Sequence, residues 1–252
     1  MAQLEREMTD VGGRRTAYFT GGEGEPLVFI HGGGILEGVG CFAPLADRYR
    51  FIAPQTPGFD RTDLRPPLRS IDELVEHTAR LLDQLEVPTF TLVGHSLGGW
   101  IASCFAAAHP ERVRRMVISC SYGFNAPLAN IAAMGRQELY EALTNDLSIF
   151  DGLIPEGDDP EYDAARASEG ASMSGFVPGP FDPALPGKLA TLRMPLLLQW
   201  GDDDRIVPIA HLPLWREALP AAEVVVYPGV GHLLYWEHEP SVEALAAFAA
   251  EA

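Results

Sequence analysis

Short apolar runs rich in branched and aromatic side chains alternate along the chain with longer stretches of helical periodicity. Runs of this length and composition are typical of strands buried on both faces of a sheet. When such strands alternate with helices, the usual result is a parallel sheet joined by crossover helices. The predicted strands are residues 27–30, 51–53, 90–93, 116–119, 196–200 and 224–227. The pattern therefore predicts an α/β fold with a mostly parallel central sheet flanked by helices.

The stretches of helical periodicity lie at residues 71–85, 97–108, 211–218 and 241–250. In the first stretch, apolar positions recur every three or four residues and fall on one side of a helix. Ser70 and Glu73 have the spacing of a capping box at its start. This helix is expected to pack against the sheet through its apolar side.

The alternation stops between residues 121 and 190, and the stretch 152–187 is dense in proline, glycine and acidic residues. A stretch of about 70 residues between two strands of one sheet is too long for a simple loop. It is predicted to form a partly helical lid, inserted into a core made of residues 1–120 and 191–252. Its apolar side chains, which either roof a pocket or pack the lid onto the core, include Phe124, Ile131, Met134, Tyr140, Leu143, Phe150, Met173 and Phe176.

The size and composition of the chain suit one large folded domain. With 252 residues, 47% of them hydrophobic and 21% charged, the chain resembles an ordinary globular protein. It carries 35 acidic and 18 basic side chains, which give a formal charge of −17 at pH 7. A surface with that charge repels phosphate backbones and anionic lipid. We therefore expect a small-molecule substrate, and neither a nucleic-acid nor a membrane partner.

The cysteines and the N-terminal residues limit the protein class further. Cys41, Cys104 and Cys120 show neither a C-x-x-C nor a Cys/His spacing that would hold a metal. A disulfide framework and a metal site are therefore not expected. The first ten residues include several charged side chains and lack the apolar core of a signal peptide. No apolar run approaches the roughly 18 residues of a membrane span. These features predict a soluble cytoplasmic protein, either a monomer or a homodimer.

A serine flanked by two glycines links the third predicted strand to the second predicted helix, in the sequence Gly94-His95-Ser96-Leu97-Gly98. In a sharp turn of this kind, a side chain two residues before or after the serine would collide with neighbouring backbone. Ser96 is therefore the predicted nucleophile, and the N–H of Leu97 at the helix start is the expected oxyanion donor. The alternative is an ordinary glycine-rich turn. His95 is expected to point away from the site and pack.

A second glycine-rich stretch follows the first predicted strand, where Leu27 to Gly34 reads LVFIHGGG. This stretch and the serine motif resemble the α/β-hydrolase superfamily, and the resemblance extends over nearly all of the chain. It implies the α/β-hydrolase fold, a mostly parallel sheet flanked by helices with an inserted lid. It also implies that the N–H of Gly33, or that of Gly34, is a second oxyanion donor. His31 is expected to have a structural role.

The acid and the base of this family come from later parts of the chain. A serine hydroxyl needs a base to take its proton, and the base needs an acid to orient it. Residues 201–208 read GDDDRIVP and resemble the family's G-x-x-D-x-x-x-P turn, which makes Asp204 the acid and Asp203 the second choice. A Gly231-His232 pair follows the last predicted strand and resembles the family's histidine loop. His232 is therefore the predicted base.

A triad of Ser96, Asp204 and His232 predicts hydrolysis of a carboxylic ester or lactone through an acyl-enzyme, with no metal or cofactor. The HGGG loop and residues 236–238 also resemble hydrolases that cleave C–C bonds in vinylogous diketones of the meta-cleavage type. Those enzymes usually have Asn before the serine, where this chain has His95. A non-catalytic ligand-binding scaffold is the third hypothesis.

Side chains close to the predicted nucleophile and base are expected to form an apolar pocket for a small or medium acyl group. Each of them is equally suited to the core, because core and pocket walls share the same apolar residue types. The predicted pocket residues are Gly34, Ile35, Trp100, Phe124, Met134, Leu233 and Trp236.

Overall fold

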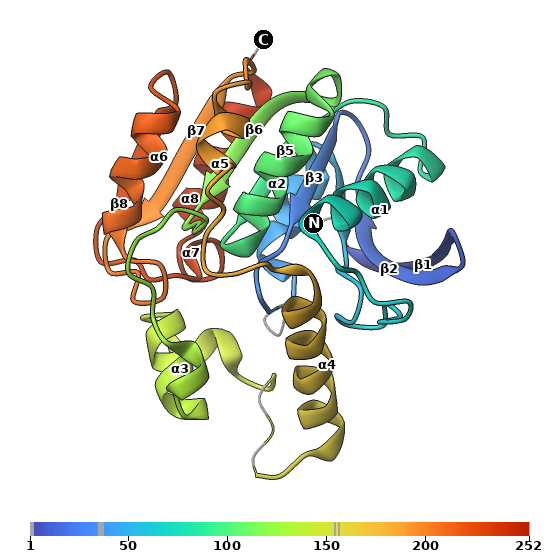
Figure 1. Cartoon of the computed structure of the whole chain (residues 1–252), viewed down its shortest axis with the longest axis vertical. Helices are drawn as coiled ribbons and strands as arrows, with labels where there is room; N and C mark the ends of the chain where they lie inside the picture. Colours follow the sequence, from blue (N-terminus) through green and yellow to red (C-terminus); the bar gives the residue numbers. More distant parts are fainter. Residues whose placement is uncertain (1–2, 35–37, 154, 156, 252) are drawn as a thin grey trace.

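The computed structural model describes residues 3–34, 38–153, 155 and 157–251. Within these residues the fold is built on an eight-stranded sheet with the strand order β1-β2-β4-β3-β5-β6-β7-β8 (Figure 1). The strands are β1 (Glu5–Val11), β2 (Arg14–Gly21), β3 (Pro26–Ile30), β4 (Arg50–Pro54), β5 (Phe90–His95), β6 (Val113–Ser119), β7 (Leu196–Gly201) and β8 (Glu223–Tyr227). All pairs from β4 to β8 are parallel, and β1 and β2 add an antiparallel hairpin at one edge. The predicted mostly parallel sheet is confirmed.

Helices cover both faces of the sheet. Helices α1 and α2 lie side by side on one face, and α8 lies on the other with the 3-10 helix η1 (Figure 1). Among the residues that the structure describes, no helix has both the length and the apolar character needed to cross a membrane. The helices are η1 (Gly40–Asp47), α1 (Ile71–Gln84), α2 (Leu97–Ala108), η2 (Pro110–Arg112), η3 (Ile131–Ala133), α3 (Arg136–Leu143), η4 (Leu147–Phe150), α4 (Pro160–Phe176), α5 (Leu185–Leu189), η5 (Ile209–His211), α6 (Leu212–Ala218), α7 (Leu234–Glu237) and α8 (Glu239–Ala250).

Each predicted strand lies inside one of the observed strands β3 to β8. The sequence pattern does not predict the hairpin of β1 and β2. Strand β1 has the sequence EREMTDV, lies at the sheet edge and exposes most of its side chains. Charged side chains on an edge strand protect it from pairing with other chains, but they leave no apolar run to mark the strand.

Helix α1 begins at its predicted cap. The side chain of Ser70 accepts a hydrogen bond from the backbone N–H of Glu73 at 3.1 Å. The Glu73 carboxylate accepts from the backbone N–H of Arg69 rather than from that of Ser70, so only half of the capping box forms. The apolar side of α1 faces the interior as expected, with Leu74, Val75, Thr78, Leu81 and Leu82 buried.

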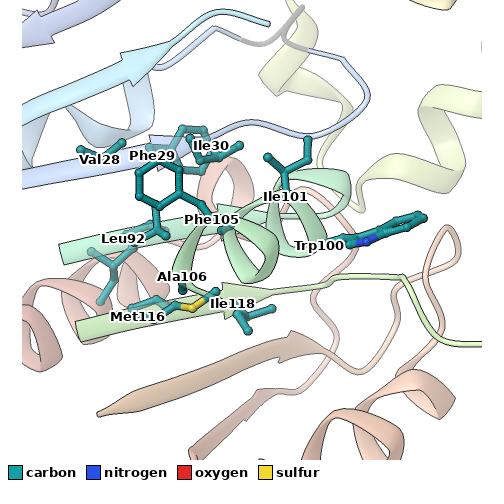
Figure 2. Close-up of a cluster of buried hydrophobic side chains, with 14 of the residues drawn as sticks. Val28, Phe29, Ile30, Leu92, Trp100, Ile101, Phe105, Ala106, Met116 and Ile118 are labelled. Carbon is teal, nitrogen blue, oxygen red and sulfur yellow. The ribbon is translucent and has the colours of Figure 1, made fainter. Parts of the chain in front are cut away.

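A cluster of large apolar side chains lies between α2 and the centre of the sheet. Figure 2 shows Phe29 of β3, Leu92 of β5 and Met116 of β6 beneath Phe105 of α2. All four are buried in the main hydrophobic cluster. Because α2 is buried along nearly its whole length, its position on the sheet is fixed. Its first residue follows Ser96, so this packing also fixes where the predicted nucleophile lies.

Between β6 and β7 the chain leaves the sheet and forms α3, α4 and α5 before it returns (Figure 1). We refer to residues 121–190 as the insertion. Gly123 and Phe181 form an isolated bridge near its two ends, and the N–H of Asp182 donates to the carbonyl of Gly123 at 2.9 Å. Helices α3 and α4 extend away from the sheet (Figure 1). Their side chains share a cavity with the carboxyl end of β5.

Protonation of the buried His77 is linked to folding. This side chain lies on α1, and a ring nitrogen contacts the hydroxyl of Thr16 on β2 at 3.2 Å. Burial, together with the positive charges of Arg14 and Arg80, lowers the pKa of His77 from 6.5 to about 4. Between these two values the unfolded chain binds a proton here and the folded chain does not. The free energy of unfolding therefore falls as the pH falls through this range.

When the pH is lowered from about 7 to about 4.5, we expect the free energy of unfolding to fall less in His77→Gln than in the wild type. The difference between the two losses should reach up to about 3 kcal/mol. The reason is that glutamine takes up no proton on unfolding. Urea unfolding of both proteins at the two pH values measures the difference. Equal losses in the two proteins would mean that folding leaves the pKa of His77 unchanged.

Candidate active site

Ser96 occupies a strained turn between β5 and α2. Its backbone has φ 55° and ψ −124°, a conformation that residues other than glycine rarely adopt. A Cβ at Gly98 would lie 2.0 Å from the carbonyl oxygen of Ile30, and a Cβ at Gly94 would lie 2.4 Å from that of Gly98. Backbone contact therefore requires glycine at both positions of the predicted motif.

Hydrogen bonds hold this turn on the sheet. The backbone N–H of Ser96 donates to the carbonyl of Ser119 at 2.9 Å, and the hydroxyl of Ser121 donates to the carbonyl of Ser96 at 2.7 Å. Helix α2 starts at Leu97, immediately after the serine. The positive end of the helix dipole and its free N–H groups therefore lie where negative charge would develop.

Asp204 lies in the turn after β7 and is buried next to a histidine. Its Oδ2 accepts a hydrogen bond from Nδ1 of His232 at 2.8 Å. Its Oδ1 accepts from the backbone N–H groups of Ile206 and Val207, at 2.9 and 2.8 Å. Three donors thus fix the carboxylate, and the carboxylate orients the imidazole. Asp203, the second choice for the acid, is exposed and pairs with a neighbouring arginine.

The loop that carries His232 is held on both sides of the histidine. The N–H of Leu233 donates to the carbonyl of Leu143 at 2.9 Å, and the N–H of Gly231 donates to the carboxylate of Glu237. Glu237 also accepts hydrogen bonds from the two residues that follow α3. Since Leu143 ends α3, the insertion helps to hold the position of His232.

Ser96 and His232 line one cavity, so the fold brings the predicted nucleophile, base and acid together. Within the described part of the chain, no hydrogen bond joins the Ser96 hydroxyl to the His232 ring. Such bonds are often long in ligand-free proteins and shorten when substrate binds. His95 was expected to point away from the site, but it lines the same cavity with its ring 4.8 Å from that of His232.

The two predicted oxyanion donors lie next to the serine. Gly33 and Leu97 both line the cavity. A Cβ at Gly32 would lie 3.0 Å from the Cβ of Ser96, so the glycine-rich loop after β3 runs directly against the nucleophile. Residues 32–34 therefore bring backbone groups into the cavity wall beside the serine.

His31 holds the glycine-rich loop in place. Its Nδ1 donates to the carbonyl of Gly32 at 2.8 Å, and its Nε2 accepts from the backbone N–H of Thr56 at 3.0 Å. Burial lowers the pKa of His31 to about 4, so the ring is neutral at physiological pH and can make both contacts. The structural role predicted for His31 is confirmed.

A cavity of about 480 Å³ lies between the carboxyl ends of the strands and the insertion. Ser96, His232 and residues 32–34 form one side of it. The apolar side chains of its wall are Leu128, Ala129, Ile131, Leu139, Leu143, Phe150, Met173, Ile206, Val207 and Leu233. The insertion also supplies polar side chains to the wall, namely Tyr140, Tyr162, Arg166 and Glu169.

Part of the predicted pocket lies in this wall. Gly34 and Leu233 line the cavity. Several insertion side chains that were expected either to roof a pocket or to pack on the core also line it: Ile131, Tyr140, Leu143, Phe150 and Met173. Ile35, another predicted pocket residue, lies outside the described residues.

Four predicted pocket residues lie elsewhere, and for them the prediction is wrong. Trp100, on α2, is fully buried with its ring edge-on to Tyr122, and Phe124 packs edge-on against a buried tryptophan of α6. Trp236 packs against two core phenylalanines and donates its indole N–H to a backbone carbonyl. Met134 lies partly buried after η3 and away from the cavity wall. Each of these side chains lies close to the site along the chain but is turned toward other neighbours.

The polar residues that α4 contributes to the wall were not predicted. Tyr162, Arg166, Glu169 and Met173 recur along α4 at intervals of four, three and four residues, which places them on one face of the helix. Arg166 pairs with Glu169 at 2.6 Å, and the Glu169 side chain is only 5% exposed. Their helical spacing could have indicated this shared face. It was not recognised because the face mixes polar with apolar residues and so forms no apolar stripe.

The thiol of Cys120 lies next to Asp204 and His232, the predicted acid and base. Three potential metal ligands lie within 4.8 Å of one another: Sγ of Cys120, a carboxylate oxygen of Asp204 and a ring nitrogen of His232. This is the one such cluster among the described residues. Burial and the negative charge of Asp204 raise the pKa of the Cys120 thiol well above 9. The Asp204 carboxylate and Nδ1 of His232 are engaged in their mutual hydrogen bond.

The family model for the alpha/beta hydrolases matches residues 27–248. The chain therefore belongs to the alpha/beta hydrolase family. It is similar to 2-hydroxymuconate semialdehyde hydrolase of Pseudomonas sp. (strain CF600), with 31% identity over 95% of this chain and 92% of that protein. Family membership and hydrolase relatives of this kind identify the chain as a hydrolase.

Two solved structures illustrate how widely this fold is shared. A serine hydrolase involved in carbazole degradation has a TM-score of 0.80 and 25% identity, covering 98% of both chains. Carboxylesterase CesB from Bacillus subtilis has a TM-score of 0.76 and 19% identity, covering 98% of this chain and 92% of that chain. At 19% identity, the similarity to carboxylesterase CesB shows only that the two proteins share a fold.

We expect Gly98→Ala to destabilise the protein by more than about 3 kcal/mol, because its Cβ would overlap the backbone of β3. Gly34→Ala is the matched control, since a Cβ there meets no atom of the described residues within 4 Å, and its stability should be close to that of the wild type. Urea or thermal unfolding of both variants measures the difference. Similar stability for the two variants would contradict the steric role of Gly98.

Proposed function

We propose that this chain hydrolyses a carboxylic ester or lactone through an acyl-enzyme on Ser96. The observation that carries the proposal is the buried hydrogen bond from Nδ1 of His232 to Oδ2 of Asp204, in the wall of a cavity that also holds the serine. The carboxylate only accepts hydrogen bonds, so the ring proton stays on Nδ1 and Nε2 is left as the base.

In the first half of the reaction, the Ser96 hydroxyl attacks the carbonyl carbon of the ester while Nε2 of His232 takes its proton. The carbonyl oxygen becomes an oxyanion, and the N–H groups of Gly33 and Leu97 donate to it. When the tetrahedral intermediate collapses, the bond to the alcohol breaks. The departing alcohol takes the proton from His232, and the acyl group remains on Ser96.

In the second half, a water molecule attacks the acyl carbon and gives one proton to Nε2 of His232. Collapse of the second intermediate releases the carboxylic acid, and the proton returns to Ser96. Asp204 stays ionised throughout and stabilises the imidazolium that forms in each half. Each oxyanion donor lowers the barrier by about 3 kcal/mol, since the charge it meets develops only in the transition state.

We also propose that the insertion, residues 121–190, is a lid that decides which substrate fits. Its side chains supply most of the apolar cavity wall, which suits an apolar acyl group. Its hydrogen bonds to the loop of His232 connect the lid to the catalytic base. A change in lid position would therefore alter both the cavity and the base.

Cleavage of a C–C bond in a vinylogous diketone is the second candidate function. The observation in its favour is the similarity to 2-hydroxymuconate semialdehyde hydrolase along almost the full length of both proteins. The same three residues would serve either reaction. We favour ester or lactone hydrolysis because the position before the serine is His95, whereas C–C hydrolases of this type usually have Asn there.

A fluorophosphonate probe is expected to label the wild type at Ser96 and to leave Ser96→Ala unlabelled, since the probe reacts only with an activated serine. Intact-mass measurement before and after labelling, followed by peptide mapping, locates the adduct. A folded wild type that takes up no probe would favour the non-catalytic ligand-binding hypothesis.

Short p-nitrophenyl esters are expected to be hydrolysed by the wild type with a kcat/KM at least about 100-fold above that of Ser96→Ala. A dienone of the meta-cleavage type, assayed beside them under the same conditions, should be a poorer substrate. Absorbance changes of p-nitrophenolate and of the dienone follow the two reactions. Turnover of the dienone alone would overturn the ester proposal and support the second candidate.

A further inference from the structure

His95 lies in the cavity wall between the nucleophile and the base, although the acyl-enzyme mechanism gives it no step. It ends β5 and immediately precedes Ser96. The residue is only 2% exposed, and its ring lies 4.8 Å from the ring of His232. Tyr235 and Trp236 pack against the ring edge-on, at 6.2 and 5.4 Å between centroids. The ring is therefore held against His232 from several directions.

Buried polar side chains connect Gln199 to His95. The Gln199 amide group donates to the carbonyl of Ser241 at 3.0 Å, so its oxygen is the atom that accepts from the Tyr235 hydroxyl at 2.8 Å. Ser119 is a neighbour of Tyr235 that opposes the rise in the pKa of that phenol. Ser119 also lies 3.1 Å from Nδ1 of His95. With the Tyr235 proton engaged by Gln199, a Ser119 hydroxyl that donates to Tyr235 would accept from an Nδ1–H group of His95.

In that arrangement the remaining nitrogen of His95, Nε2, is a lone-pair acceptor. Within the described residues, Nε2 is buried and has no hydrogen-bond partner. Burial, and then the charge on His232, lower the pKa of His95 well below 6.5, so the ring stays neutral at physiological pH. A buried acceptor without a partner is destabilising and is rare in native proteins. Such a group next to a catalytic base suggests a function.

A neutral ring that presents a free lone pair stabilises a positively charged imidazole beside it. In the proposed mechanism His232 becomes positive in both halves of the reaction. Aromatic rings attract cations through their faces, and a nitrogen lone pair adds negative potential at the ring edge. A His95 that carried its own charge would repel His232, and burial prevents this because it lowers the pKa of His95.

We propose that His95 is a positioning residue for His232: its Nδ1 carries the ring proton, and its ring and the free lone pair of Nε2 stabilise the charged form of the base. The proposal rests on the proposed serine-hydrolase mechanism, in which His232 must gain a proton before either bond breaks. His95 itself takes up no proton and touches no reacting atom. It acts on the rate of the chemical step and leaves substrate binding nearly unchanged.

Two substitutions of His95 separate this role from simple packing. His95→Phe keeps an aromatic ring of similar size but removes both nitrogens. His95→Asn removes the ring but keeps a donor for Ser119 and an acceptor. If His95 only filled space, His95→Phe would be the more active variant, because it leaves no hole. The proposal predicts the opposite order.

We expect His95→Phe to lower kcat for a p-nitrophenyl ester by roughly tenfold with KM within about twofold of the wild type. His95→Asn should retain at least about threefold more kcat than His95→Phe, although its thermal midpoint should be the lower of the two. Opposite orders of activity and thermal stability support the proposal. Equal kcat for His95→Phe and wild type, or parallel losses of activity and stability, would overturn it.

The rate of fluorophosphonate labelling at Ser96 is the second readout, because it needs the serine and the base but no particular substrate. The same order, wild type above His95→Asn above His95→Phe, is expected. If the wild type is labelled but hydrolyses no ester, the ester proposal fails, and the labelling rates still decide the role of His95. A wild type that is not labelled overturns both proposals.

His77→Phe is the matched control. His77 is also a buried histidine whose pKa is lowered by burial, but it lies on α1 and outside the cavity wall. Its labelling rate should equal that of the wild type. A loss as large as that of His95→Phe would mean that replacing any buried histidine disturbs the site, and it would overturn the specific role of His95.

Discussion

The close approach of backbone to backbone around Ser96 is the constraint on which the rest of the site depends. The serine is held at φ 55° because β5, α2 and the loop after β3 converge there with no room for a Cβ at Gly94 or Gly98. Burial of α2 along its length keeps that convergence in place. The energy stored in the strained turn is thus balanced by a large apolar contact, and the hydroxyl is presented at the sheet edge.

The proposed catalytic base, His232, depends on a second set of contacts, which join parts of the chain far apart in sequence. Asp204 orients His232, while Leu143 and Glu237 hold the loop in which His232 lies. Because Leu143 belongs to the insertion, the segment that roofs the cavity and the loop that carries the base are not independent. This connection is a physical reason why lid sequence and catalytic rate would vary together among related enzymes.

The cavity combines an apolar wall with a small polar group of side chains on α4. Apolar burial favours an acyl group without charge, whereas the ion pair of Arg166 and Glu169 keeps two opposite charges in the same wall. A largely buried pair of this kind contributes little net stability, so its place in the cavity wall suits a role in substrate selection better than a role in folding.

The sequence by itself determined the features that depend on local or short-range patterns. Strands β3 to β8 and the turn around Ser96 could be read directly, because buried strands need continuous apolar runs and tight turns need glycine. Asp204 and His232 were predicted from the resemblance of their turns to those of the α/β-hydrolase family. Strand β1 gave no apolar signal because it is a charged, exposed edge, and β2 has no long apolar run. Only the tertiary structure decided that Trp100 and Trp236 belong to the core while Tyr162 and Arg166 line the cavity. It also placed His95 against the base, because the direction of a side chain at a turn depends on what packs around it.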